Sequence, residues 1–203
     1  MLGDFELIVV NDGSNDGTKD EIDRAAKEIP ELEPLHLSHE GKGQALRVGA
    51  KQAKGDFVIF FDSDLDLPPE QILFFIAMQR AKNADAVIGS KMHPDSTVDY
   101  PLIRRIYSRG YIMLTKVHFK MPVRDTQTGL KLVRRSFLLA ALEETQLKGF
   151  ALDLELIVRL VQGGARIVEA PVVVDFQTKF GGVGVGTVWE ILQETFEIWR
   201  RTR

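Results

Sequence analysis

Carboxylates gather directly after the most apolar strand-like run of the chain. Asp62 and Asp64 follow residues 57–61 (FVIFF), and Asp66 comes two residues later. Parallel sheets bind ligands beyond the carboxyl ends of their strands, so these side chains stand where a site would form. Two aspartates at positions i and i+2 of a turn can reach one hard cation, and Mg²⁺ or Mn²⁺ held in this way bridges substrate phosphates. Turn and helix-capping chemistry before Pro68 is the competing explanation.

Two further turns fall on the same side of the predicted sheet. Asp12, Gly13 and Ser14 follow an apolar run, and Lys42 lies between two glycines at the expected start of a helix. A carboxylate in the first turn can accept hydrogen bonds from a base or a ribose. Lys42 adds a positive charge to helix N-terminal amides that already favour phosphate. Each turn is common by itself, so this prediction depends on their sharing an edge with Asp62.

Positive charge is concentrated in one segment, although the whole chain has a formal net charge of −3. Between Pro101 and Arg135 there are nine lysines and arginines and one acidic residue, Asp125. The rest of the chain has 17 basic and 28 acidic residues. A solvated helix face explains most of these basic residues individually. The bias of the group predicts an anionic partner, which we do not expect to be a nucleic acid.

Composition excludes several classes of protein. The 203 residues are 44% apolar and 27% charged, which is typical of one soluble globular domain. The longest apolar run, residues 72–78, is far shorter than the roughly 20 residues of a membrane-spanning helix. The absence of cysteine excludes disulfides, thiol catalysis and cysteine-ligated metals, and four scattered histidines offer no metal cluster.

Short β-rich runs alternate with helical patterns, which predicts an α/β fold with a mostly parallel central sheet flanked by helices. The expected strands are residues 5–10, 35–37, 57–61, 86–88, 130–133 and 167–176, and Pro171 in the last of these indicates an edge strand or a bulge. The expected helices are residues 18–28 with Thr18 as the cap, 42–54, 68–82, 102–119 and 152–162. We expect one domain, residues 1–180, and a C-terminal appendage, residues 181–203.

Five ordered motifs together resemble family 2 glycosyltransferases, in particular the dolichyl-phosphate glucose and mannose synthases and their bacterial polyprenyl-phosphate counterparts. The motifs are VVNDGSNDGT (9–18), GKGQALRVG (41–49), DSDL (62–65), DTQTGLK (125–131) and GFALDLEL (149–156). The resemblance covers residues 5 to about 176. It implies a GT-A fold, a nucleotide-sugar donor, a divalent metal on the D-x-D motif and inversion at the anomeric carbon.

The resemblance also implies roles for single residues. It implies nucleotide-sugar contacts for Asp12, Gly13, Ser14, Lys42, Asp62 and Asp64, and Mg²⁺ or Mn²⁺ contacts for Asp62, Asp64 and Asp66. Arg124 and Thr128 resemble an acceptor-phosphate site, which Arg105 or Arg109 of the preceding helix joins. The residues expected to act in catalysis are Asp64, Arg124 and Asp153. Asp153 stands where hydroxyl-directed relatives keep a base, and it either orients the sugar or acceptor here or caps its helix.

An acceptor phosphate explains why arginines would suffice without a base. A sugar hydroxyl must lose its proton before it attacks, whereas a phosphate monoester, with a second pKa near 6, is already largely dianionic at neutral pH. The main task of the site is then to position the acceptor phosphate. Guanidinium groups hold the phosphate while the metal neutralises the departing diphosphate.

The C-terminal appendage joins a glycine-rich hinge, residues 181–186, to an amphipathic helix. Its apolar stripe and terminal arginines are Val188, Trp189, Ile191, Leu192, Thr195, Phe196, Ile198, Trp199, Arg200, Arg201 and Arg203. With a polyprenyl acceptor implied, the favoured interpretation is an interfacial helix on an anionic membrane. The alternative is packing on its own domain or on a second subunit.

The chain departs from the family at its start. Members begin with an earlier strand that ends in a Pro-x-x-Asn-Glu type motif, followed by a helix, and this sequence has neither. We expect residue 1 to be an internal Met of a longer protein, and a truncated relative is the alternative.

These observations predict an inverting, metal-dependent glycosyltransferase. It would move a hexose from UDP-glucose or GDP-mannose to a polyprenyl or dolichyl phosphate, peripherally on the cytoplasmic face of a membrane. Two alternatives remain open: a family 2 enzyme that acts on a sugar hydroxyl with Asp153 as base, and a non-catalytic module that binds nucleotide sugars.

Overall fold

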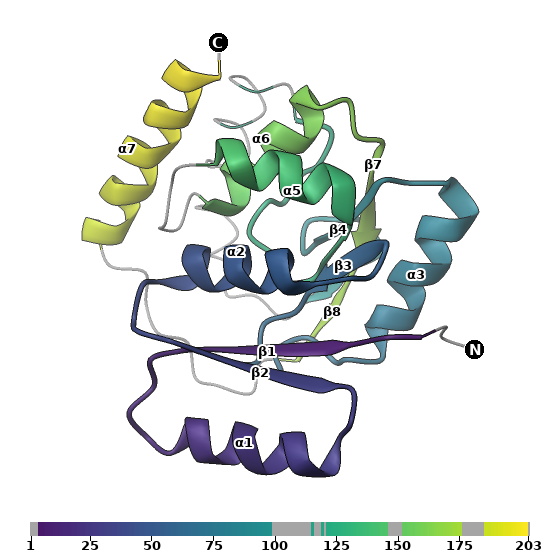
Figure 1. Cartoon of the computed structure of the whole chain (residues 1–203). Helices are drawn as coiled ribbons and strands as arrows, with labels where there is room; N and C mark the ends of the chain where they lie inside the picture. Colours follow the sequence, from purple (N-terminus) through teal and green to yellow (C-terminus); the bar gives the residue numbers. More distant parts are fainter. Residues whose placement is uncertain are drawn as a thin grey trace.

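Three small sheets and the helices around them position the predicted site (Figure 1). The computed structural model describes residues 4–98, 115, 119, 121–145, 152–175 and 185–202, and for 185–192 it describes the backbone alone. The strands are β1 (Leu7–Asp12), β2 (Leu32–Leu37), β3 (Phe57–Phe60), β4 (Ala86–Ser90), β5 (Thr97–Val98), β6 (Lys131–Arg134), β7 (Ile167–Pro171) and β8 (Val173–Val174). The helices are α1 (Thr18–Glu28), α2 (Lys42–Gln52), α3 (Gln71–Lys82), α5 (Arg135–Glu144), α6 (Leu152–Gln162) and α7 (Val185–Arg201).

Strand direction brings the ends of distant segments to one edge of the sheet. The four-stranded sheet has the order β3-β6-β4-β7, in which β6 is antiparallel to both β3 and β4, and β4 is parallel to β7. The expected α/β fold with a central sheet is confirmed, and β6 is the strand that opposes the common direction. Because β6 runs against β3, the residues that precede β6 lie beside those that follow β3.

The central sheet is covered on both faces. Side chains alternate along its strands, so Ala86 and Ile88 of β4 face one core cluster while Val87 faces the other. The first cluster also takes side chains from α2, α5, α6 and α7, and the second takes Phe75 from α3. Figure 1 shows α3 apart from the layer that contains α2, α5 and α6. Burial on both faces explains why the strands read as continuous apolar runs.

Several local predictions need correction. Thr18 is the first residue of α1 and not its cap: Gly17 precedes it with a φ of 84°, and the Thr18 hydroxyl donates to Asp16 Oδ1 at 2.6 Å. Helix α3 begins at Gln71, one turn after the proline pair that was expected to start it. Pro171 does lie on an edge strand, as predicted. The helix expected over residues 102–119 lies almost entirely outside the described residues.

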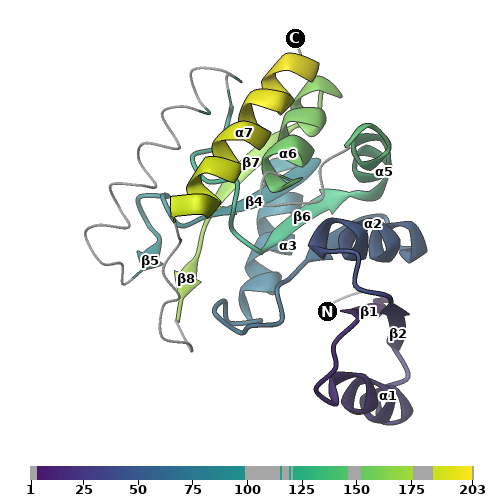
Figure 2. The same ribbon diagram turned by 90° about the vertical axis from the view of Figure 1, so that its left-hand side faces the viewer.

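Helix α7 packs on its own domain through the residues whose side chains are described. Ile198 is fully buried in the first core cluster, and Thr195 is also buried. The Gln162 side chain at the end of α6 donates to the carbonyl of Thr202 at 2.8 Å, and Figure 2 shows α7 beside α6. Phe196 is 62% exposed. Along this inner face α7 packs on its own domain, while the predicted membrane contact of its outer face, where Phe196 is exposed, stays a prediction.

The described part of the chain contains no helix with both the length and the apolar character needed to cross a bilayer.

Asp85 ties three strands of the central sheet together. Its Oδ1 accepts a hydrogen bond from Arg134 Nε of β6 at 2.8 Å, and its Oδ2 accepts one from the main-chain nitrogen of Arg166, just before β7, at 3.0 Å. Burial alone would raise the pKa of Asp85, but the hydrogen bonds and charges of Arg166 and Arg134 outweigh it, so the pKa lies below its ordinary value.

Substitution of Asp85 by asparagine is expected to weaken the dependence of stability on acid pH. Because the folded pKa lies below the unfolded one, the carboxylate contributes fully above about pH 4 and its contribution is lost as pH falls through the folded pKa. Urea unfolding midpoints between pH 3 and pH 7 would measure this, with Asp95→Asn, at an 82% exposed carboxylate, as control. Identical pH profiles for Asp85→Asn and the parent protein would contradict the assignment.

Candidate functional site

An ion pair joins two of the residues predicted to contact the donor. Lys42 is the first residue of α2, and its Nζ lies 2.9 Å from Oδ1 and 3.2 Å from Oδ2 of Asp62, in the turn after β3. The Lys42 side chain is 50% exposed and that of Asp62 is 35% exposed. The start of α2 and the end of β3 therefore present opposite charges at one accessible place.

The charge of Lys42 is maintained by three carboxylates from two segments, the turn after β3 and helix α6. Burial alone would lower the pKa of Lys42, but the negative charges of Asp153, Asp62 and Asp64 outweigh it, so the pKa lies above its ordinary value. The ammonium form is therefore retained throughout the physiological pH range. The same electrostatic coupling places Asp153 near Lys42, as well as the two carboxylates of the D-x-D motif.

Asp12 fixes the loop that leads into α2. It is the last residue of β1, and its carboxylate accepts hydrogen bonds from the main-chain nitrogens of Glu40 at 2.8 Å and Gly41 at 2.9 Å. His39 Nδ1 lies 3.2 Å from the same carboxylate. Asp12 thus has a structural role in addition to its predicted contact with the nucleoside, which stays a prediction.

The turn after Asp12 is closely packed. Gly13 has a φ of 75°, and a Cβ atom added there would lie 2.7 Å from the main-chain nitrogen of His39. The main-chain nitrogen of Ser14 donates to Oδ1 of the buried Asn11 at 3.0 Å. Only glycine allows both this backbone conformation and this approach to the loop before α2.

The D-x-D turn supplies oxygen atoms that suit a divalent cation, but not as a preformed cluster of three. Asp64 Oδ1 accepts a hydrogen bond from the main-chain nitrogen of Asp66 at 3.1 Å. Among the described residues, no three His, Cys, Asp or Glu side chains converge as a metal site. The predicted contact of Asp66 with the metal stays a prediction. Mg²⁺ and Mn²⁺ need only one or two carboxylates when substrate phosphates complete the coordination, and Asp62 and Asp64 fit that requirement.

The backbone that precedes β6 lies directly against the D-x-D motif. A Cβ atom added to Gly129 would overlap the carboxylate of Asp62, well inside van der Waals contact. Glycine at this position lets the segment before β6 approach a charged side chain at the end of β3. The two segments are far apart in the sequence and meet because β6 runs antiparallel to β3.

Replacing Gly129 with alanine is expected to displace the Asp62 carboxylate from Lys42. We expect the affinity for a nucleoside diphosphate with Mn²⁺ to fall about 10-fold, the equivalent of one charge-assisted hydrogen bond. Titration calorimetry would measure this. Gly49→Ala is the matched control, because its new methyl group would meet only side-chain methyl groups of β1. Unchanged affinity in folded Gly129→Ala would show that the close packing has no role in binding.

Asp125 organises the loop formed by residues 124–129. Its Oδ2 accepts hydrogen bonds from the main-chain nitrogen of Lys91 at 3.0 Å and from the Thr128 hydroxyl at 2.6 Å, and its Oδ1 accepts one from the nitrogen of Gln127 at 2.8 Å. Thr128 is 1% exposed. Its hydroxyl holds the loop in this structure, and its predicted contact with an acceptor phosphate stays a prediction.

Arg124 is the described arginine of the predicted phosphate site. Its main-chain nitrogen donates to Oε1 of Glu169 at 2.6 Å, and its Nε lies 3.7 Å from Oε2 of the same residue. The Arg124 side chain is 45% exposed, so the guanidinium can reach a ligand. Arg105 and Arg109 lie outside the described residues.

Asp153 is held by a lysine that the sequence patterns did not single out. Lys131 Nζ donates to Asp153 Oδ1 at 2.8 Å and to the carbonyl oxygen of Thr128 at 2.6 Å. Lys131 is 1% exposed and Asp153 is 8% exposed. Lys131 belongs to the DTQTGLK motif and to the basic segment, and neither pattern predicts a role for it. The available signal was a lysine within the apolar run of residues 130–133, because a buried charge needs a partner. No such signal marked Glu169.

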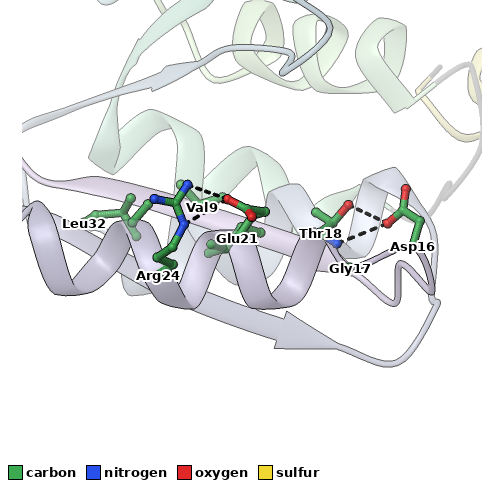
Figure 3. A pocket seen from close by; sticks show the side chains of 9 residues that line it. Val9, Asp16, Gly17, Thr18, Glu21, Arg24 and Leu32 are labelled. Carbon is green, nitrogen blue, oxygen red and sulfur yellow. Dashed lines mark hydrogen bonds and ion pairs between the residues drawn. The ribbon is translucent and has the colours of Figure 1, made fainter.

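A cavity of about 640 Å³ lies away from these residues, between α1 and the β1–β2 pair (Figure 3). It is lined by Val9, Asp16, Gly17, Thr18, Glu21, Ile22, Arg24, Ala25 and Leu32. Arg24 is engaged there by Glu21, with Nη2 and Oε2 2.6 Å apart. None of the predicted site residues lines this cavity, so it belongs to the packing of α1.

Relatives of known name match most of the chain. It is 32% identical over 189 residues to Glycosyltransferase AglD of Haloferax volcanii, which covers 93% of this chain and 30% of the relative. It is 30% identical to Dolichyl-phosphate beta-glucosyltransferase ALG5A of Trichomonas vaginalis, with 83% of this chain and 53% of the relative covered. It is 29% identical to Undecaprenyl-phosphate mannosyltransferase of Micrococcus luteus, with 82% and 70% covered. The chain thus spans about a third to a half of the length of the first two relatives.

Solved structures share the fold. The chain superimposes on glucosyl-3-phosphoglycerate synthase from Mycobacterium tuberculosis with a TM-score of 0.65 and 18% identity, over 97% of this chain and 69% of that one. Another structure of that enzyme contains Mn²⁺, UDP-glucose and phosphoglyceric acid, and matches with a TM-score of 0.65 and 15% identity, over 97% of this chain and 68% of that one. These likenesses establish a GT-A fold. The family model "Glycosyl transferase family 2" matches residues 2–140, and the chain belongs to that family.

Proposed function

We propose that the protein transfers a hexose from a nucleotide sugar, UDP-glucose or GDP-mannose, to a polyprenyl or dolichyl phosphate. The transfer inverts the anomeric carbon and depends on Mg²⁺ or Mn²⁺. Two of the three named relatives act, by name, on dolichyl phosphate or undecaprenyl phosphate, which supports this class of acceptor.

The observation that carries the proposal is the contact between Gly129 and Asp62. Asp62 and its partner Lys42 belong to the motifs predicted to hold the donor, and Gly129 belongs to the motif predicted to hold the acceptor. A transferase must bring its two substrates to one place, because the reacting atoms have to approach to about 3 Å. Close packing of these two motifs is therefore what transfer between a donor and an acceptor would require.

The residues divide into a donor side and an acceptor side. On the donor side, Asp12 contacts the nucleoside, Lys42 attracts the diphosphate, and Asp62 and Asp64 would hold the cation. The cation, when bound, neutralises charge on the leaving diphosphate. On the acceptor side, Arg124 binds the lipid phosphate, a group that needs no general base at neutral pH.

The acceptor chemistry favours a position at a membrane surface. We place the protein peripherally on the cytoplasmic face, with the outward side of α7 toward the lipid. Exposed Phe196 and its neighbour Trp199, whose ring centroids are 5.6 Å apart, would lie at headgroup level, with Arg200 and Arg201 close to anionic lipid.

Product formation with a series of donors tests the proposal. The protein would be incubated with radiolabelled UDP-glucose or GDP-mannose, polyprenyl phosphate and Mn²⁺ or Mg²⁺, and the lipid fraction would be extracted. We expect an acid-labile labelled glycolipid with one donor, and none after chelation of the metal. Nucleotide binding without product from any donor would instead favour a non-catalytic nucleotide-sugar-binding module.

Transfer to a sugar hydroxyl is the second candidate, because Asp153 shares the Lys131 ammonium with the carbonyl of Thr128, and the next residue, Gly129, packs on Asp62. As a base, Asp153 would have to accept a proton, yet Oδ1 of its carboxylate is already bound to the Lys131 ammonium. Labelled product on a soluble sugar and none on the lipid would establish this candidate.

A further inference from the structure

A buried ammonium connects the two sides of the proposed site. Lys131 Nζ contacts the Asp153 carboxylate at 2.8 Å and the Thr128 carbonyl at 2.6 Å. We infer that Lys131 is a positioning residue, which holds Asp153 and the 124–129 loop in one fixed arrangement around the reacting groups. The inference rests on the proposed function and adds to it a residue that touches no substrate.

Burial of the Lys131 ammonium destabilises the folded protein unless its contacts with Asp153 and Thr128 are both made. Lys131 pairs with Phe60 of β3 on one side and with Ile88 of β4 on the other, in the middle of the sheet, and is 1% exposed. A charged group removed from water needs an opposite charge and satisfied hydrogen bonds. Apolar residues of similar volume commonly replace a buried ion pair without loss of stability, so fold stability alone does not explain a lysine here.

Asp153 binds one ammonium group and acts electrostatically on a second. Lys131 binds it from the head of β6, and the Asp153 charge also acts on Lys42 at the start of α2. Lys42 in turn binds Asp62 at 2.9 Å. The carboxylate on α6 is therefore part of a charge network that includes the D-x-D motif, and Lys131 is its most buried member.

The Thr128 contact extends the network to the acceptor side. The Thr128 hydroxyl is bound to Asp125, its carbonyl is bound to Lys131, and the following residue, Gly129, packs on Asp62. Loss of the Lys131 ammonium would therefore release the loop and the Asp153 carboxylate together. The expected consequence is misplacement of bound substrates, which lowers kcat, while donor binding at Asp12 and Lys42 is retained.

The test compares Lys131→Met, Asp153→Asn and the double variant. For Lys131→Met we expect kcat to fall about 100-fold while the KM for the donor stays within about threefold, as for misplaced substrates. The double variant removes both charges, so its thermal midpoint should return toward that of the parent protein while kcat stays low.

A purely structural pair would behave differently. Recovery of the parental kcat in the double variant would overturn the inference, and so would a folded Lys131→Met protein with unchanged kcat. A second measurement does not need activity: the ¹⁵N signal of a slowly exchanging lysine ammonium, lost in Asp153→Asn, reports the pair itself. If that signal is present but the parent protein transfers no sugar to any acceptor, the proposed function fails and the pair stands; if the signal is absent from the parent protein, the inference fails.

Discussion

Replacing Asp64 with alanine is expected to lower the rate of glycosyl transfer about a thousandfold, with the protein still folded. Asp64 lies close enough to Lys42 to raise its pKa, while Asp62 holds the direct ion pair with that lysine. Of the two carboxylates proposed to hold the cation, Asp64 is thus the one without a direct ion pair to Lys42. A loss of this size is typical when a fixed charge that acts on the leaving group is removed.

The effect should appear in the metal dependence as well as in the rate. Initial rates would be measured at increasing Mn²⁺ for the parent protein, for Asp64→Ala and for Asp95→Ala. Asp95 is the matched control, because it is an exposed aspartate in the loop after β4. If Asp64→Ala transferred sugar at the parental rate with the same Mn²⁺ dependence, the proposed role of Asp64 in binding the cation would be contradicted.

Replacing Arg124 with alanine is expected to raise the KM for the lipid phosphate between 10-fold and 100-fold, by rough conversion of a hydrogen bond to a charged group. The guanidinium is 45% exposed, and its residue is fixed by the main-chain bond to Glu169 at 2.6 Å. That bond does not involve the side chain, so the loop should keep its conformation in the variant. Donor affinity should change little, because Arg124 is not among the groups that contact Lys42 or Asp62.

The Arg124→Lys variant distinguishes the effect of the positive charge from that of the planar guanidinium group. Lysine keeps the positive charge but lacks the planar fork that binds phosphate through two donors, so we expect it to recover only part of the affinity. Arg80→Ala, at an exposed arginine of α3, is the control for loss of a surface charge. A KM for the donor that rises as much as the KM for the lipid would contradict an acceptor role for Arg124.

The elements predicted well from sequence were those with strong local signals. The boundaries of α1 and α6 agree with prediction, because apolar periodicity and a glycine at or next to an end mark both helices. Helix α5 was missed because it follows β6 without an intervening turn: Arg134 ends the strand and Arg135 begins the helix. The reversed direction of β6 was equally hidden, since a short apolar run has the same pattern in either direction.

The site was predicted in part, for a related reason. Motifs made of turn residues at strand ends locate Asp12, Lys42 and Asp62, because β1 and β3 both end beside the start of α2. The hydrogen-bond partner of each side chain could not be predicted from these motifs. The Thr128 hydroxyl binds Asp125 and the Lys131 ammonium binds Asp153, and both pairings depend on tertiary packing that brings β6 beside α6.

The central claim is that the acceptor nucleophile is a phosphate. The most direct measurement compares a polyprenyl phosphate with the polyprenol of the same chain length, under one donor and one Mn²⁺ concentration. We predict labelled glycolipid from the phosphate and none from the alcohol, because the ligand proposed for the exposed Arg124 is a dianion and the Asp153 carboxylate is bound by Lys131. Equal rates with both lipids, or product from the alcohol alone, would contradict it.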